Sequence, residues 1–592
     1  MASSDASSTR LFHGHATLVS RSAYFLLAAL IGTVVSLATL LLIEAIGLVQ
    51  WVSYGAASET RFASIAAEQP WWRVLLVPVI GGLVVGAILR YLPGRRYHGI
   101  ADVMETCAFN SGRMGVRSGI GAAIAASVSL GAGAPLGREG PAVHIGASLS
   151  AWLAERLNLD RSRTLALLGC GAAAAVTTSF NAPLAGVLFA LEVIVGYYTL
   201  RVFAPVVIAS MAAVVVRNAL IGSEPLFAIG EYPPHAAWEL LLFALLGIVA
   251  ALLVKLFIVL VSTIREACDR MQLPLWMRPA LAGLLIGVIA IQFPMILSIG
   301  YEPTRLALEQ SLDLGDLLVL LFLKTLGTAI ALGGEFAGGV FSPSVFIGAM
   351  LGGSFILLLG TIAPFSSSQG LYSVAGMAAV SSAMLGAPIS TVLIVFELTR
   401  DYGVTLAVMT AAAFASATMQ LGEHASFFRW QLANRGVNIS AGRDLSLLMT
   451  HTIDRLVTQS CAVASVHHHC REVEVLLGQQ RRRIAVMLDD DQTFRGSIEL
   501  RELIAHRNAT ETNPLVAEIC HAETIAATRS TNVVTALQMM ADNDIDYLPV
   551  VALLETGEDN RHVFEGLIYK ADLLAEHYAV LRKARDEEFG VA

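Results

Sequence analysis

Long apolar stretches, separated by short polar or glycine-rich segments, dominate the chain from about residue 21 to residue 420. Several are shorter than the ~20 residues of a perpendicular membrane span, so we expect tilted, partial or broken helices. A broken helix end is tolerated inside a bilayer only where protein or a wet cavity satisfies its free N–H groups. The pattern therefore predicts an all-α polytopic membrane domain whose helix ends surround a cavity. The apolar stretches lie near residues 24–52, 74–92, 119–134, 142–154, 164–178, 183–197, 202–220, 237–262, 279–298, 316–333, 341–364, 371–385, 388–399 and 404–421.

Two sets of residues recur along this domain at nearly equal offsets. Residues 137–147 read G-R-E-G-P-A-V-H-I-G-A and residues 339–349 read G-V-F-S-P-S-V-F-I-G-A, an offset of 202. A second set recurs at an offset of 205 and matches Gly171, Pro183 and Glu192 with Gly376, Pro388 and Glu397. Duplicated halves with glycine- and proline-interrupted apolar segments indicate a transport site where the repeats meet.

The chain changes character after about Arg435, where charged residues become dense. Two units follow, 452–507 and 516–579, each with a helix, an apolar strand, a polar loop, a glycine, a second strand and an acidic helix start. This order predicts a tandem soluble α/β module at the C-terminus.

Composition agrees with a membrane protein. Hydrophobic residues make up 55% of the chain and charged residues 15%, against about 25% charged residues in ordinary soluble proteins. The net charge of −8 comes largely from the C-terminal module, and no basic stripe indicates nucleic-acid binding. The run 24–52 is too long for a cleaved signal peptide and is expected to remain as the first membrane helix. Six scattered cysteines predict no disulfide framework.

Glu139 is the residue that most needs an explanation, because a carboxylate at bilayer depth costs ~2.5–3.5 kcal/mol. It stands in G-R-E-G-P, and the same Gly-x-x-x-Pro frame recurs at Gly339 to Pro343. A glycine turn followed by proline opens a helix whose N–H groups and positive dipole end can bind an anion. For any single glycine, close packing between helices is an equal alternative. For Glu139, the alternative is a salt bridge to Arg138.

These motifs, with F-N-A-P-L-A-G at residues 180–186 and G-G-V-F-S-P at residues 338–343, resemble the CLC family of chloride channels and proton/chloride exchangers. The C-terminal module resembles a pair of CBS domains. The resemblance implies a multi-pass protein of the cell or inner membrane with two inverted repeats, a homodimer with one chloride path per subunit, and cytoplasmic CBS domains. It implies a transport protein, not an enzyme, that requires no cofactor.

The expected domains follow from the repeats and the change in composition. They are an N-terminal cytoplasmic segment 1–21, a transmembrane domain 22–436 with repeats at about 22–220 and 237–436, a linker 437–449, CBS domains 450–509 and 515–579, and a tail 580–592.

By the resemblance, Glu139 is the gating glutamate, whose carboxylate competes with the permeant anion. The backbone N–H groups of Val340 and Phe341 match the positions that coordinate the central anion. The expected anion site also includes His98, Gly99, Ile100, Arg138, Gly140 and Phe428.

Two departures weaken this expected site. His98 replaces the serine of the family motif G-S-G-I-P, and it is either an N–H donor or a neutral packed histidine. Phe428 takes the place of a tyrosine and removes a hydroxyl. We therefore predict a site that relies on backbone amides and binds chloride weakly.

Three further positions concern protons. Exchangers of the family usually carry an inward-facing glutamate where this chain has Val193, directly after Glu192. Valine cannot carry a proton, which favours channel-like passive conduction, with proton/chloride exchange as the alternative. Glu335, where the family has small residues, is expected to modulate pH dependence, and Glu192 is a second modulatory candidate. Glu335 could instead be neutral, paired with Lys324, or an alternative proton carrier.

The CBS pair offers one weak nucleotide signal. Of the positions three and six residues after each glycine, only Asp572 fits a ribose-binding pattern, so a structural or dimerising module is preferred to an adenine-nucleotide sensor. The run His467 to Cys470 is interpreted as a loop or helix face, with no metal site, because adjacent residues rarely converge on one ion.

Two other classes of protein fit the sequence less well. A cation transporter would need more acidic pore residues. An intramembrane enzyme using Glu139 and His144 lacks a second metal ligand.

Overall fold

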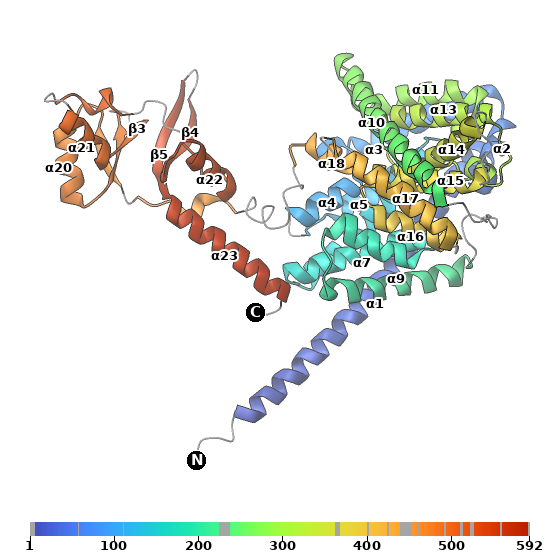
Figure 1. Ribbon diagram of the computed structural model, residues 1–592, viewed down its shortest axis with the longest axis horizontal. Coiled ribbons are helices and arrows are strands. Elements are labelled where there is room, and N and C mark those ends of the chain that lie inside the picture. The colour runs from blue at the N-terminus through green and yellow to red at the C-terminus, as the bar shows by residue number, and fades with distance from the viewer. Residues whose placement is uncertain are drawn as a thin grey trace. The chain divides into compact units, whose positions relative to one another are not determined.

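The computed structural model describes residues 6–56, 59–109, 112–223, 237–360, 368–399, 402–422, 425–437, 451–459, 461–489, 493–509, 513–520, 526–556 and 559–589. The chain divides into two compact units, Met1–Asn438 and Ile439–Ala592. In Figure 1, the first unit is a bundle of packed helices, and the strands belong to the second unit. The predicted fold class, an all-α polytopic domain followed by an α/β module, is confirmed.

The helices of the first unit include eight that are long and apolar enough to span a membrane, counted over the described residues. Shorter apolar helices accompany them, as the lengths of the apolar stretches predict. The longer helices of the unit, in chain order, are α1 (Ala6–Tyr54), α2 (Phe62–Ala67), α3 (Trp71–Leu89), α4 (Ile100–Ala108), α5 (Val116–Gly131), α6 (Glu139–Arg156), α7 (Arg161–Phe180), α8 (Pro183–Phe189), α9 (Leu200–Leu220), α10 (Leu240–Arg270), α11 (Arg278–Gln292), α12 (Tyr301–Leu308), α13 (Leu314–Gly333), α14 (Phe341–Gly360), α15 (Gln369–Leu385), α16 (Pro388–Thr399), α17 (Tyr402–Gln420) and α18 (Phe427–Ala433). Single turns are η1 (Glu59–Arg61), η2 (Pro93–Arg95), η4 (Ala237–Glu239) and η5 (Pro294–Ile296), and η3 (Ala190–Val195) is a π-helix.

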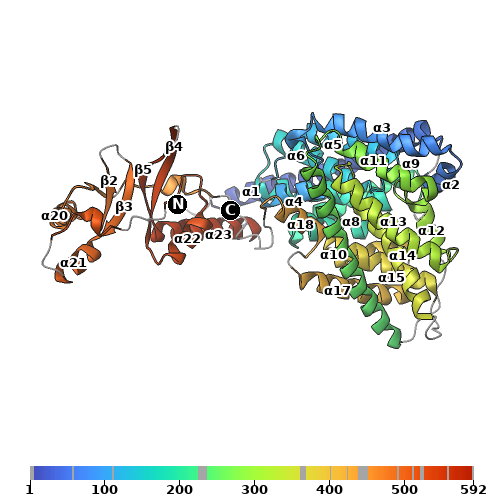
Figure 2. The same ribbon diagram turned by 90° about the horizontal axis from the view of Figure 1, so that it is seen from above.

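The two halves of this unit use the same packing. Helix α1 packs on α9 in the first half as α10 packs on α17 in the second, and α6 packs on α7 as α14 packs on α15. Helices of different halves also meet, α3 with α11 and α8 with α16; Figure 2 shows α3 and α11 at the same side of the bundle. The duplication in sequence is therefore a duplication of structure.

Two local expectations differ from the structure. Helix α1 begins at Ala6, so most of the predicted segment 1–21 is helical, although the apolar span within α1 starts at Ser22. The short helices α2, α4, α12 and α18 lie outside the predicted apolar stretches. Polar residues such as Asp102, Glu105 and Arg305 interrupt the apolar pattern of α4 and α12.

The second unit contains two αβ halves. In the first, β1 (Ala462–Ser465) pairs in parallel with β2 (Ile484–Leu488), and β2 pairs antiparallel with β3 (Phe494–Glu499). In the second, β4 (Tyr547–Thr556) pairs antiparallel with β5 (Asp559–Tyr569). The remaining elements are η6 (Ile453–Leu456), α20 (Cys470–Gln480), α21 (Leu500–Ala509), η7 (Val516–Glu518), α22 (Val533–Asp542) and α23 (Lys570–Phe589).

A buried cluster of Ile484, Val486, Leu488, Tyr547 and Leu567 joins the two halves. The predicted tail 580–592 continues α23 as far as Phe589. Of the predicted linker 437–449, all but Val437 lies outside the described residues.

Candidate anion site

The two Gly-x-x-x-Pro frames meet directly. The amide of Gly137 donates to the carbonyl oxygen of Gly339 at 2.8 Å, and the amide of Gly339 donates back to the carbonyl oxygen of Gly137 at 2.7 Å. This antiparallel bridge joins the segments that lead into α6 and α14. The N-termini of both helices are therefore held side by side, as the repeat predicts.

Glycine fits this crossing because the backbones approach so closely that an added Cβ would be crowded. A Cβ built on Gly140 would lie 3.1 Å from the Cα of Gly339, and one built on Gly339 would lie 3.0 Å from the amide nitrogen of Gly140. A Cβ on Gly137 would lie 2.5 Å from a carboxylate oxygen of Glu139. The repeated glycines therefore serve close backbone approach.

Glu139 lies at this crossing with its side chain 1% exposed. Its Oε1 accepts a hydrogen bond of 2.5 Å from the hydroxyl of Ser342, the second residue of α14. The carboxylate thus lies at the N-terminal end of the second repeat's helix, where free N–H groups and the helix dipole favour negative charge.

Arg138 does not pair with the neighbouring carboxylate. Its guanidinium Nη1 lies 2.6 Å from the Oε2 of Glu59, and its Cζ lies 5.4 Å from the centre of the Tyr301 ring. The alternative that Arg138 locks Glu139 in a salt bridge is therefore wrong. The Arg138 side chain also does not line the cavity described next.

A cavity of about 250 Å³ lies beside the crossing. Of the predicted site residues it brings together five: Gly99, Ile100, Gly140, Val340 and Phe428. Phe341 instead lines a smaller cavity of about 20 Å³.

The smaller cavity contains an aromatic contact. The ring of Phe341 lies 4.6 Å from that of Phe180, measured between ring centres.

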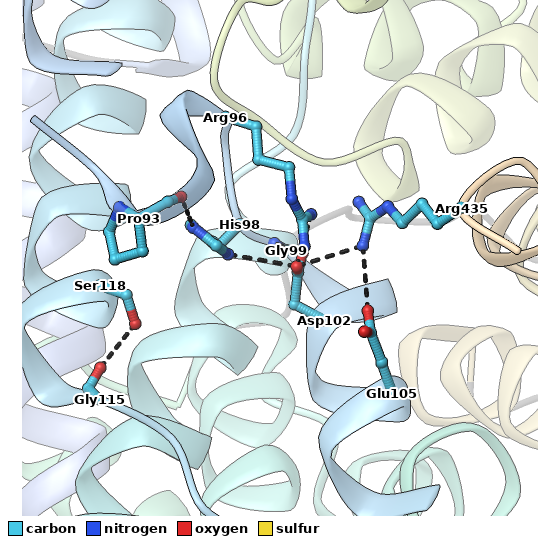
Figure 3. Close-up of polar contacts among 9 residues, drawn as sticks. All are labelled: Pro93, Arg96, His98, Gly99, Asp102, Glu105, Gly115, Ser118 and Arg435. Atoms are coloured by element: carbon cyan, nitrogen blue, oxygen red, sulfur yellow. Dashed lines mark hydrogen bonds and ion pairs between the residues drawn. The ribbon is translucent and has the colours of Figure 1, made fainter. Parts of the chain in front are cut away.

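His98 does not line the larger cavity. Its Nδ1 lies 3.2 Å from the Oδ1 of Asp102, and its Nε2 lies 2.9 Å from the carbonyl oxygen of Pro93 (Figure 3). The amide of Gly99 donates to the other oxygen of Asp102 at 2.8 Å. The expectation that His98 coordinates the anion is therefore corrected, because both of its ring nitrogens already contact groups of the protein. Gly99 lines the cavity, but its amide is engaged with Asp102.

Asp102 organises a charged cluster that the sequence analysis missed. Its Oδ1 lies 2.6 Å from the Nη1 of Arg96 and 3.2 Å from the Nη1 of Arg435, which also lies 3.6 Å from Glu105 (Figure 3). The signal for part of it was present, since an aspartate three residues after Gly99 is a common helix-start pattern. Arg435 could not be assigned, because it lies more than three hundred residues from Asp102.

Glu335 also lines the larger cavity and has a left-handed backbone, with φ of 64°. Its Oε1 pairs with Arg265 at 3.1 Å. The suggested pairing with Lys324 is wrong, because that ammonium is fully buried and donates to the carbonyl oxygens of Ile296 and Ser298 at 2.8 and 2.7 Å.

The wall of this cavity is more basic than acidic. Its arginines are Arg96, Arg265, Arg278 and Arg435, and its carboxylates are Asp269 and Glu335. Asp102 and Glu105, which do not line the cavity, pair with Arg96 and Arg435 and offset this excess.

Glu192 and Val193 lie in η3. The carboxylate of Glu192 accepts hydrogen bonds from the amides of Ile389 at 3.1 Å and Ser390 at 2.8 Å, at the start of α16. Val193 is buried. The carboxylate of Glu192 is thus engaged in a helix cap.

The C-terminal unit contains no group of three or more metal-ligating side chains within its described residues, nor does the described part of the first unit. The Nδ1 of His468 accepts from the Ser465 amide at 3.2 Å, and the Nδ1 of His469 lies 2.9 Å from the Asn513 carbonyl. These histidines lead into α20, as the loop interpretation expects. Asp572 lies in the first turn of α23.

Comparison with known proteins agrees with this geometry. A sequence model described as the voltage gated chloride channel matches residues 80–420, and one for the CBS domain matches residues 516–578. A ClcB-like chloride channel protein of Ralstonia nicotianae is 33% identical over 395 residues, which cover 65% of this chain and 91% of the relative.

Two solved structures share the fold. A slow cyanobacterial Cl⁻/H⁺ antiporter has a TM-score of 0.61 at 20% identity, over 70% of this chain and 97% of that chain. A eukaryotic CLC transporter has a TM-score of 0.59 at 18% identity, over 94% and 98%. The family match, the relative and the geometry of the crossing together show that this integral membrane chain belongs to the CLC family of voltage-gated chloride channels.

Proposed function

We propose that this chain conducts chloride passively, as a channel, and that the carboxylate of Glu139 gates the path. The observation that carries the proposal is the position of that carboxylate between the N-termini of α6 and α14, held by Ser342. The N–H groups that favour a carboxylate there also favour a chloride ion, so the two compete for one place. Protonation of Glu139 would remove its charge and its advantage in that competition.

Val193 supports passive conduction over coupled exchange. The side chain is apolar and buried in η3, so it can neither bind nor release a proton. A proton path through this position would have to rely on water alone.

Proton/chloride exchange is the second candidate, favoured by one observation. Glu335 provides a carboxylate in the wall of the cavity, paired with Arg265, and could carry a proton in place of the missing acid at Val193. The solved antiporter with this fold makes exchange a chemistry that the architecture accommodates.

Reversal potentials of the full chain in liposomes distinguish the two modes. We expect the reversal potential to follow the chloride gradient alone and to remain unchanged when a pH gradient is imposed. A shift with the pH gradient would overturn passive conduction and establish coupling. In that event, loss of the shift in Glu335→Gln would identify this residue as the proton carrier.

The assembly is also part of the proposal. We expect a homodimer in a cell or inner membrane with one path per subunit and cytoplasmic CBS domains. Asp572 alone matches a nucleotide-binding pattern, so a structural CBS pair remains preferred. Unchanged thermal stability of the full chain on addition of ATP would agree with this preference.

A further inference from the structure

The hydroxyl oxygen of Tyr97 is buried and has no hydrogen-bond partner among the described residues. Tyr97 lies in the short segment between η2 and α4. Buried hydroxyls in folded proteins almost always have a partner, because losing water without compensation is unfavourable. A ligand or a water molecule must therefore complete this group.

The backbone directs Tyr97 and His98 to opposite sides. Arg96 and Gly99, which flank them, both have extended backbone, and successive side chains of an extended segment alternate in direction. His98 faces Asp102. The His98 ring also stacks on His144 of α6, with ring centres 5.6 Å apart. Tyr97 accordingly faces the other way, toward Gly140 in the first turn of α6.

The Tyr97 hydroxyl reaches the crossing of the two repeats. Its oxygen lies 3.6 Å from the position of a Cβ built on Gly140, in the first turn of α6. Tyr97 lines the same cavity as Gly140, Val340 and Phe428. Phe428 lacks the hydroxyl that the family tyrosine would bring to this cavity, and Tyr97 brings one from a different element.

We propose that the Tyr97 hydroxyl donates a hydrogen bond to the small inorganic anion that occupies this cavity. The proposal rests on the function proposed above, because it assumes that this cavity lies on the anion path. In this proposal the Tyr97 hydroxyl, and not His98, is the side-chain donor from this segment. The N-terminal ends of α6 and α14 beside the cavity favour an anion over a cation, and the donor favours chloride over anions with diffuse charge.

Chloride titration of the purified full chain by calorimetry tests the proposal. Tyr97→Phe removes only the hydroxyl, and we expect about tenfold weaker chloride binding, as for the loss of a hydrogen bond to a charged group. The half-saturating chloride concentration for flux in liposomes should rise by a similar factor and provides a second readout where binding heats are small. Affinity for thiocyanate, a weaker hydrogen-bond acceptor, should fall less.

Tyr54→Phe is the matched control. Tyr54 is fully buried, its hydroxyl donates to the carbonyl oxygen of Ala132, and it does not line the cavity. We expect unchanged chloride affinity in this variant even if its stability falls.

Equal chloride affinity, or an equal half-saturating concentration, in Tyr97→Phe and wild type would overturn the proposal. An equal loss for chloride and thiocyanate would also overturn it, because that pattern indicates a distorted site. These outcomes are independent of the reversal potential, so the Tyr97 proposal and passive conduction can fail separately.

Discussion

The carboxylates of Glu192 and Glu397 each cap a helix of the opposite repeat. Glu192 accepts from two amides in the first turn of α16 at 3.1 and 2.8 Å, and Glu397 accepts from two amides in the first turn of α8 at 2.9 and 2.8 Å. Donors and acceptors in the two caps correspond at the same offset of 205 residues. These two helix caps connect one half of the domain to the other by hydrogen bonds.

Removing either cap should lower stability to a similar extent. Glu192→Ala and Glu397→Ala each lose an N-terminal cap, which costs about 1 kcal/mol and should lower the unfolding midpoint in detergent by about 2 °C. Glu309→Ala, which removes an exposed carboxylate with only a 3.8 Å ion pair to Arg305, is the control and should leave the midpoint unchanged. A change in flux for Glu192→Ala without a loss of stability would instead support a modulatory role for Glu192.

Offsets in the sequence predict the meeting points of the fold because the duplicated halves pack on each other. Gly137 and Gly339, 202 residues apart, form the bridge itself. The frames could be located from sequence alone, since glycine fits the close backbone approach there and proline suits the helix start. Short helices with polar residues, such as α4, have no repeated glycine or proline frame and no long apolar run that would predict them.

Side-chain direction at the site could not be predicted in the same way. Tyr97 and His98 are adjacent, and a shift of one position exchanges which of them faces the cavity. The partners of Arg138 and Glu335 come from distant segments, Glu59 and Arg265, and no local pattern specifies them. The sequence therefore predicted where the two repeats meet, but some side-chain contacts there differ from the expected ones.

Glu139→Gln should abolish the pH dependence of chloride flux. In the wild type, ionisation of the carboxylate strengthens its competition with chloride, so flux should fall as pH rises. The glutamine is neutral at every pH and should give a flat profile. If the carboxylate holds the site about nine-tenths of the time at alkaline pH, the variant should conduct about tenfold faster there, as measured by chloride efflux from liposomes.

Glu302→Gln is the control for this substitution. Glu302 is also a buried glutamate, but it accepts from the Ser64 amide at 3.0 Å and lines a different, small cavity. Chloride flux through the Glu302→Gln variant should keep the wild-type pH dependence. A Glu139→Gln profile that still slopes with pH would exclude Glu139 as the titrating gate.

Glu335→Gln should increase flux at low ionic strength and change its pH dependence. The substitution leaves Arg265 unpaired in the cavity wall, which raises the local anion concentration, and we expect about a twofold increase that salt suppresses. Glutamine preserves side-chain length at the left-handed backbone of this position.

Asp269→Asn separates charge from proton binding. Asp269 also lies in the cavity wall and pairs with Arg278 at 2.7 Å, so its substitution removes the same charge. A similar increase in flux in both variants, with an altered pH profile only in Glu335→Gln, would support the modulatory role. An unchanged pH profile in Glu335→Gln would exclude a role of Glu335 in the pH dependence.

The buried phenol of Tyr547 should make the C-terminal unit sensitive to alkali. The two hydroxyls lie 3.0 Å apart where the αβ halves meet, and burial raises the pKa of Tyr547 to about 12. Below pH 10 the phenol is protonated in both the folded and the unfolded chain, so its contribution to stability is complete. Between pH 10 and 12 only the unfolded chain releases the proton, so the free energy of unfolding should fall, by about 2–3 kcal/mol in all.

Pulse labelling of Cys470 in the full chain measures this loss, because its thiol is buried in the core of the first half. The urea midpoint for labelling should fall more between pH 9 and pH 11.5 in wild type than in Tyr547→Phe, which cannot titrate. Ser497→Ala keeps the phenol and loses only its partner, so it should start less stable yet retain the alkaline fall. Equal falls in wild type and Tyr547→Phe would mean that another group causes the alkaline sensitivity and that the neutral phenol at this junction contributes nothing to it.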